Sequence, residues 1–230
     1  MWKYGIKYKS NKLTHHGYHR FYDMYLNPLR HQKINFLEIG IDHKRSLNMW
    51  LDFFTNANIY GIDIGFDAIY NRGKVFRGDQ SNLDDLKIVV DEIHKCQVIL
   101  DDGSHVPEHQ LISFNYLFKE CLDYGGIYII EDIETSYWTK GDLYGYKIKA
   151  GFKSKKNIIN IFKDIIDIVN REFLTSKNLE FIKNKSKIDL DNLKYISSIN
   201  FSGNCIIITK MTENDYKRYG ERKYRFINKL

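Results

Sequence analysis

Two short segments of the sequence carry acidic side chains in a pattern typical of a metal centre. Asp102 ends the first segment, Glu131 and Asp132 end the second, and each segment follows an apolar run that indicates a buried strand. Neighbouring strands lie roughly 5 Å apart, so the three carboxylates would converge and repel unless a cation or protons compensated. An all-oxygen cluster suits a hard ion. We therefore predict a site for Mg²⁺, or another hard divalent cation; helix caps with one shared proton are the alternative.

A histidine follows the first acidic segment closely. His105 lies three residues beyond Asp102. Imidazole titrates near neutral pH, and a divalent cation makes a hydroxyl easier to deprotonate. We predict that His105 is the general base that takes the proton from an acceptor hydroxyl. A merely solvated or capping histidine is the alternative, and the nearby acids favour the catalytic interpretation.

Acidic residues also end the other predicted strands. In open α/β sheets, ligands bind beyond the carboxyl ends of the strands. A single acid at a strand end is usually a cap or a turn residue, whereas five consecutive strands with such acids indicate a ligand site. In chain order these acids are Glu38, Asp63, Asp79, Asp101 with Asp102, and Glu131 with Asp132.

The turn after the first strand distinguishes between cofactors. A dinucleotide needs a glycine-rich turn so that the backbone can approach its pyrophosphate. Here Gly40 is followed by bulky residues up to Ser46, and GxGxxG is absent. S-adenosylmethionine (SAM) carries no phosphate, so this turn favours SAM over NAD. Asp63 is placed to accept hydrogen bonds from the ribose, with Glu38 and Asp79 toward the ammonium and adenine ends.

Strand-like and helical segments alternate along the chain from residue 34. This alternation predicts a mostly parallel, seven-stranded sheet with helices on both faces, an α/β fold of the Rossmann-like class I SAM-dependent methyltransferase type. A long amphipathic helix is expected over residues 158–173. The predicted strands lie at residues 34–40, 58–63, 74–79, 97–102, 127–132 and, as a pair, 194–210.

Three regions are expected in the chain. Residues 1–33 predict a helical lid or extension, because their apolar and aromatic residues recur at helical spacing. Residues 34–210 form the predicted methyltransferase domain. Residues 211–230 form a basic C-terminal tail. The length of 230 residues suits one domain with such extensions.

Composition and charge argue against several classes of protein. The net charge of +6 is concentrated at the two ends, whereas the predicted site is acidic, which argues against nucleic-acid binding. The sequence contains no apolar run long enough to span a membrane, and its start lacks the apolar core of a signal peptide. Three widely spaced cysteines are typical of reduced core residues. We expect a cytoplasmic protein.

The motifs together resemble the mycinamicin-type sugar O-methyltransferases, which depend on SAM and magnesium and methylate deoxysugars in macrolide biosynthesis. The similarity spans residues 34–210, although the first turn has fewer glycines than that family. It rests on residues 37–40, 46–50, 60–64, 78–81, 101–105 and 131–138.

The resemblance implies a role for each of these positions. It implies that Asp102, Glu131 and Asp132 bind the metal and that His105 is the base. It also implies that Gln80 and Ser81 lie along the cofactor. The complete set of predicted cofactor-binding residues is Glu38, Gly40, Ser46, Asp63, Asp79, Gln80, Ser81 and Asp101.

The sequence is compatible with more than one methyl acceptor. A sugar hydroxyl on a nucleotide sugar, a glycan or a glycosylated metabolite is our first expectation. A catechol-like acceptor is the second, since the same carboxylates can bind two adjacent hydroxyls of either kind. A SAM-binding protein with a nucleic-acid role is the third. An aromatic stretch (Tyr137, Trp138, Tyr144 and Tyr146) can stack on a sugar ring or simply pack. Homo-oligomerisation is left open.

Overall fold

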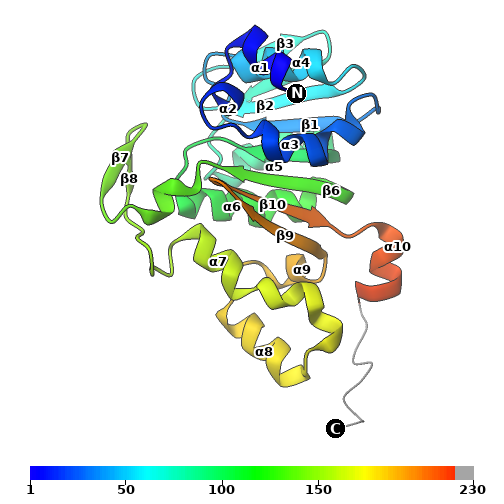
Figure 1. Ribbon diagram of the computed structural model, residues 1–230, viewed down its shortest axis with the longest axis vertical. Helices are drawn as coiled ribbons and strands as arrows, with labels where there is room; N and C mark the ends of the chain where they lie inside the picture. The colour runs from blue at the N-terminus through cyan, green and yellow to red at the C-terminus, as the bar shows by residue number, and fades with distance from the viewer. Residues whose placement is uncertain (221–230) are drawn as a thin grey trace.

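The computed structural model describes residues 1–220 and contains one large mixed sheet (Figure 1). Eight strands follow the order β3-β4-β2-β1-β5-β6-β10-β9. The five inner strands from β4 to β6 are parallel, whereas β3, β10 and β9 pair antiparallel with their neighbours. The strands are β1 Asn35–Ile39, β2 Asn58–Asp63, β3 Ala68–Tyr70, β4 Gly73–Arg77, β5 Cys96–Asp101, β6 Leu122–Glu131, β9 Ile196–Ser202 and β10 Cys205–Lys210.

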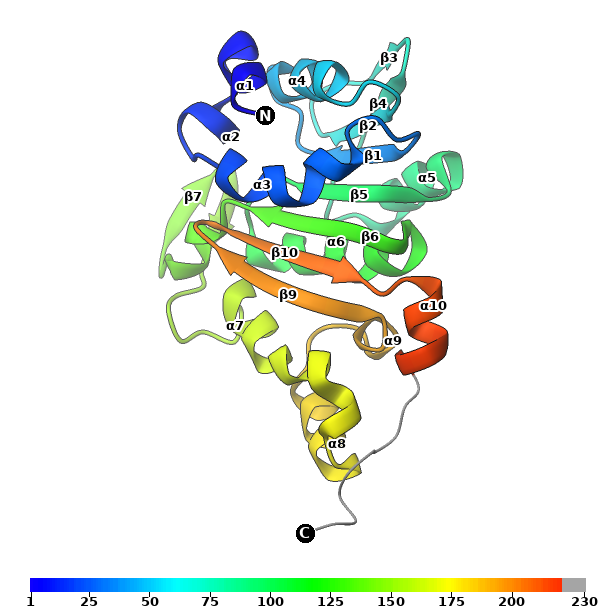
Figure 2. The ribbon, with the colours of Figure 1, turned by 45° about the vertical axis from the view of Figure 1, so that its right-hand side comes forward.

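Helices cover both faces of this sheet, so its central strands are buried on both sides and form nearly continuous apolar runs. One face packs against α4 and the N-terminal helices, through a cluster that includes Tyr22 and Trp50. The other face packs against α5, α6 and α7, through a cluster that includes Phe114 and Phe162. In Figure 2, α3 lies in front of the sheet and α6 behind it. These helices are α4 Arg45–Phe53, α5 Leu83–Ile93, α6 Pro107–Glu120 and α7 Ile158–Asp164.

The N-terminal segment packs directly onto the sheet. Its helices bury Leu13, Tyr18, Tyr22 and Leu26 in the same cluster as residues of β1, β2 and β5. It therefore forms part of the core on this face. Its elements are α1 Trp2–Tyr8, α2 Asn11–Thr14, α3 His19–Leu26 and the 3₁₀ helix η1 Asn27–Leu29.

Shorter elements complete the described chain. A hairpin projects away from the large sheet after η2 (Figure 1). Within residues 1–220, no helix is both long and apolar enough to cross a membrane. Residues 221–230 of the predicted basic tail lie outside the described residues. The remaining elements are η2 Ile133–Tyr137, β7 Gly141–Leu143, β8 Tyr146–Ile148, η3 Ile166–Phe173, α8 Ser176–Lys185, α9 Leu190–Leu193, α10 Glu213–Asp215 and η4 Tyr216–Gly220.

Two details of the fold differ from the sequence prediction. The large sheet has eight strands instead of seven, because β3 adds three residues antiparallel to β4, too few for an alternating pattern to be recognised. The helix expected over 158–173 is divided between α7 and η3, and Asn170 has non-helical backbone angles. The residues around this junction, Asp164, Ile165, Ile166 and Asp167, are aspartate or β-branched and have lower helix propensity than straight-chain residues.

Candidate active site

A cavity of about 520 Å³ lies at the carboxyl ends of the parallel strands. Its lining includes eight of the predicted site residues, which lie after β1, β2, β4, β5 and β6. The cavity size suits a small-molecule ligand. The eight residues are Gly40, Ser46, Asp63, Asp79, Gln80, Asp102, His105 and Asp132.

Gly40 allows the first turn to pass close to the strand beside it. Its φ is +82°, and a Cβ built there would lie 2.2 Å from the backbone oxygen of Asp102. Asp42 and Lys44 also have positive φ values, 44° and 62°, although neither is a glycine. The turn thus reaches with non-glycine residues a conformation that glycine usually supplies.

Asp63 holds this turn in place. Its Oδ2 accepts the backbone N–H groups of Ile41 at 2.9 Å and Asp42 at 3.2 Å, and its Oδ1 accepts that of Gly65 at 2.7 Å. A carboxylate offers about four acceptor positions, so capacity remains for a hydroxyl in the cavity. The residue predicted to bind ribose therefore also shapes the loop around it.

Three of the predicted cofactor residues do not line the cavity. Glu38 is fully buried and accepts hydrogen bonds from Ser46 Oγ at 2.9 Å and Trp50 Nε1 at 3.2 Å. Ser81 donates from its backbone N–H and its Oγ to Asp79, both at 2.8 Å. Glu38 and Ser81 therefore hold Ser46 and Asp79, which do line the cavity.

Asp101 is the third, and it positions the loop that carries His105. It is fully buried and accepts Gln80 Nε2 at 3.0 Å and Ser113 Oγ at 2.7 Å. Gln80 Oε1 in turn accepts the backbone N–H of Ser104 at 2.7 Å. Burial raises the pKa of Asp101, although these donors oppose the shift. Asp101 is thus linked through Gln80 to the residue before His105.

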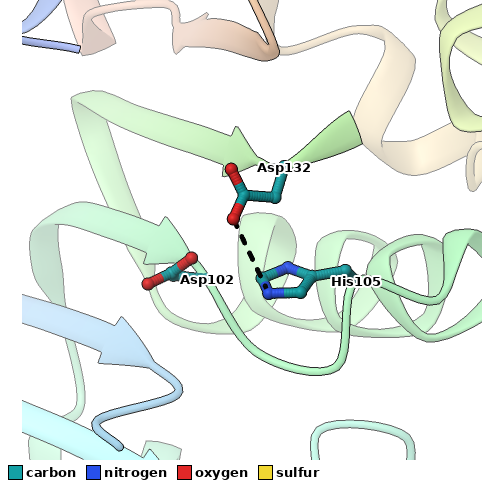
Figure 3. A group of neighbouring side chains, drawn as sticks. All are labelled: Asp102, His105 and Asp132. Carbon is teal, nitrogen blue, oxygen red and sulfur yellow. Dashed lines mark ion pairs between the residues drawn. The ribbon is translucent and has the colours of Figure 1, made fainter. Parts of the chain in front are cut away.

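The predicted metal site lies where β5 and β6 end. Asp101 pairs with Ile130 in the parallel register, so Asp102 and Glu131 follow at the same edge. Potential ligand atoms of Asp102, His105 and Asp132 lie within 4.8 Å of one another, and Figure 3 shows both carboxylates beside the imidazole. His105 Nε2 is 3.8 Å from Asp132 Oδ2. Its Nδ1 is buried and has no hydrogen-bond partner among the described residues.

This donor set fits a hard divalent cation. Mg²⁺ is usually held by one or two carboxylates, with water or substrate oxygens completing the coordination. Asp102 and Asp132 offer two carboxylates that face the cavity. Burial would raise the pKa of Asp102, but Lys12 and His105 outweigh it and hold that pKa below its usual range. The carboxylate is therefore ready to bind a cation.

Lys12 is a site residue that the sequence did not reveal. Its side chain is 2% exposed, and its Nζ lies 2.7 Å from Glu131 Oε2 and 3.2 Å from Glu38 Oε1. It also forms an ion pair with Asp102. Nothing in the sequence distinguishes this lysine from the other basic residues of the N-terminal segment.

Two tyrosines of the N-terminal segment reach the same acids. Tyr18 donates to Asp132 and Tyr22 donates to Glu131. Burial raises the pKa of Tyr18 and of Tyr22, and the nearby negative charge of Glu131 raises both further. Both hydroxyls therefore stay protonated and act as donors.

Aromatic side chains form part of the cavity wall. Tyr144 and Tyr146, from the β7–β8 hairpin, line it. The Tyr144 ring is 5.9 Å from that of His105, and the Tyr146 hydroxyl donates to Asp79 at 3.2 Å. Tyr137 and Trp138 are outside the lining; Tyr137 stacks on Phe152 instead.

The sheet order, the acid at the end of β2 and the cavity beyond the strands define a class I SAM-dependent methyltransferase fold. A solved structure with the same fold is the MycE methyltransferase of the mycinamycin biosynthetic pathway, in complex with Mg, S-adenosylhomocysteine (SAH) and mycinamycin VI. The TM-score is 0.78 at 24% identity, over 98% of this chain and 55% of that chain.

Sequence comparison identifies the family within this class. The chain is 34% identical over 180 residues to L-olivosyl-oleandolide 3-O-methyltransferase of Streptomyces antibioticus, covering 73% of this chain and 45% of that protein. It is 33% identical over 171 residues to mycinamicin VI 2''-O-methyltransferase of Micromonospora griseorubida, covering 70% and 41%. Over 70–73% of its length the chain is thus homologous to macrolide and glycoside sugar O-methyltransferases.

The chain spans less than half the length of these curated relatives. No family model matches it. The resemblance predicted from the motifs is confirmed at the level of family and fold.

Proposed function

We propose that this chain is a SAM-dependent, magnesium-assisted O-methyltransferase that methylates a hydroxyl of a sugar on a glycosylated small molecule. The observation that carries the proposal is one cavity lined by Asp63, by the Asp102–Asp132 carboxylate pair and by His105. A donor site, a cation site and a base therefore lie within reach of one ligand-sized space.

The residues after β1, β2 and β4 suit the methyl donor. Asp63 would accept hydrogen bonds from the ribose hydroxyls, and its bonds to the first turn keep its carboxylate fixed. Gln80 and Asp79 line the same part of the cavity. Binding on these rigid elements would align the methyl group with the acceptor, and such alignment can supply much of the rate enhancement.

His105 suits the role of general base. Its ring lies beside the two carboxylates that face the cavity (Figure 3), and its loop is positioned by Gln80 and Ser104. A divalent cation at Asp102 and Asp132 would stabilise the negative charge that develops on the acceptor oxygen. His105 would take the proton from that hydroxyl and keep it from returning.

The hairpin residues suit the acceptor. Tyr144 is 67% exposed and lies near His105, so its ring offers a face on which a sugar can stack. A catechol-like acceptor is the second candidate, because the same two carboxylates can accept either kind of diol. We also propose a cytoplasmic location, which the three free cysteines support.

A methyl-transfer screen tests this proposal. Nucleotide sugars, glycosylated macrolides and catechols would be offered with labelled SAM, with and without EDTA. We expect transfer to a sugar hydroxyl that EDTA abolishes and Mg²⁺ restores. Transfer to catechols alone would favour the second candidate, and transfer that is indifferent to EDTA would contradict the role of the cation.

A further inference from the structure

The N-terminal segment donates a hydrogen bond to each acid of the predicted metal cluster. Lys12 contacts Asp102 and Glu131, Tyr18 contacts Asp132, and Tyr22 contacts Glu131. Since one segment supplies all of these donors, its packing on the sheet determines which hydrogen bonds the acids accept.

Among these donors only Lys12 carries a charge, and it is held by three acids. Glu38, Asp102 and Glu131 surround its Nζ. Lys12 is therefore a permanent ammonium, and part of the negative charge of the cluster is already neutralised without a metal ion.

Glu131 differs from Asp102 and Asp132 in access. Its side chain is 1% exposed, against 20% for Asp102 and 14% for Asp132. Both of its oxygens are engaged, Oε1 by Tyr22 and Oε2 by Lys12. A cation that enters from the cavity meets Asp102 and Asp132 directly, but reaches Glu131 only if Lys12 and Tyr22 move away.

We propose that the Lys12 ammonium occupies the Glu131 carboxylate permanently, so that Glu131 does not act as a ligand of the metal ion. In this chain the divalent ion would then be held by Asp102 and Asp132 beside His105, without Glu131. This inference rests on the proposed function for the presence of an ion. Lys12 is a positioning residue: it fixes Asp102 from the buried side, and its charge opposes a second cation.

The consequence is a metal affinity that Lys12 weakens. Removing one unit of positive charge from the immediate surroundings of a divalent ion strengthens binding by roughly tenfold or more. Removing Lys12 and the charge of Glu131 together leaves the balance nearly unchanged. Substituting both members of a buried ion pair is also tolerated better than breaking the pair, so the double variant is expected to fold.

The experiment measures Mn²⁺ binding by isothermal titration calorimetry on the full chain, at fixed ionic strength and with SAH present. The variants are Lys12→Met, the double variant Lys12→Met with Glu131→Gln, and Lys7→Met. Lys7 lies in the same segment, is exposed and pairs with Asp52, so it controls for the loss of one positive charge. We expect Lys12→Met to bind Mn²⁺ at least tenfold more tightly. The double variant should bind within about threefold of wild type or more tightly, and Lys7→Met should match wild type.

Two results would overturn the inference while the proposed function stands. One is a Lys12→Met protein that binds Mn²⁺ no more tightly than wild type. The other is a double variant that binds at least tenfold more weakly, because Glu131 would then be a ligand. The double variant alone decides the question if Lys12→Met does not fold. Wild type that binds no Mn²⁺ would contradict both proposals, and wild type that binds Mn²⁺ but methylates no sugar would contradict only the proposed function.

Discussion

Replacing Asp63 with asparagine tests whether one carboxylate both shapes the first turn and binds the methyl donor. Asparagine has nearly the same size but only one side-chain oxygen. In one orientation it keeps the N–H groups of Ile41 and Asp42 and loses that of Gly65; in the other it loses the first two. In both cases an NH₂ group faces a backbone N–H, and no rotation of the side chain removes this conflict.

The expected magnitude follows from these bonds. A hydrogen bond to a charged group contributes about 1.5–3 kcal/mol, and at least one is lost. We therefore expect the free energy of unfolding to fall by about that amount. If the ribose bond is also weakened, the dissociation constant for SAH should rise about tenfold to a hundredfold, because 1.4 kcal/mol corresponds to a factor of ten.

Calorimetry with SAH measures the affinity, and thermal unfolding without ligand measures the stability. Asp67→Asn is the matched control, because Asp67 is an exposed acid four residues further along. An Asp63→Asn protein that is destabilised but binds SAH within threefold of wild type would restrict Asp63 to a structural role. Unchanged stability and unchanged affinity together would refute the reasoning for both roles.

Three further substitutions separate the parts of the site. His105→Ala should keep the fold and SAH binding while kcat falls about 10²- to 10⁴-fold; near-normal turnover in a methyl-transfer assay would remove His105 from the chemistry. Gly40→Ala should lower the free energy of unfolding by at least about 2 kcal/mol in a denaturant titration, because positive φ strains alanine and its Cβ would meet the Asp102 oxygen; a change below 0.5 kcal/mol, in the range of ordinary surface substitutions, would contradict this. Tyr144→Ala should raise KM for the sugar acceptor more than for SAM, and the reverse order would exclude the hairpin from acceptor binding.

Local patterns were sufficient to predict where the central strands lie along the chain. The central strands carry apolar residues on both faces because both faces are buried. An acid lies at or just after the end of each of these strands, and those of β2, β4, β5 and β6 that line the cavity are Asp63, Asp79, Asp102 and Asp132. Edge elements carry less information. Strand β3 contains three residues and is half-exposed, so it leaves no periodic signal.

The acids at the strand ends were recognised as one group, but their individual tasks depend on contacts between distant residues. Glu38 and Asp63 both end strands in the sequence. In the structure, however, Glu38 points into the protein toward Ser46 and Trp50, while Asp63 reaches the cavity. In a parallel sheet, alternate side chains point to opposite faces, and the bend after each strand decides which acid remains exposed. That bend is set by backbone contacts such as the approach of Gly40 to Asp102.

Lys12 shows why the charge of a site cannot be counted from its motifs alone. It lies 90 residues before Asp102 and 119 before Glu131 in the chain, on a short helix, and the packing of the N-terminal segment against the sheet brings it there. Three converging carboxylates indicated a divalent ion because such a cluster needs positive charge. The same need is met in part by an ammonium from the protein. Motif resemblance therefore predicts which acids converge. The protein cations that pair with these acids become known only from the fold, and they determine how many carboxylates are left to bind a metal ion.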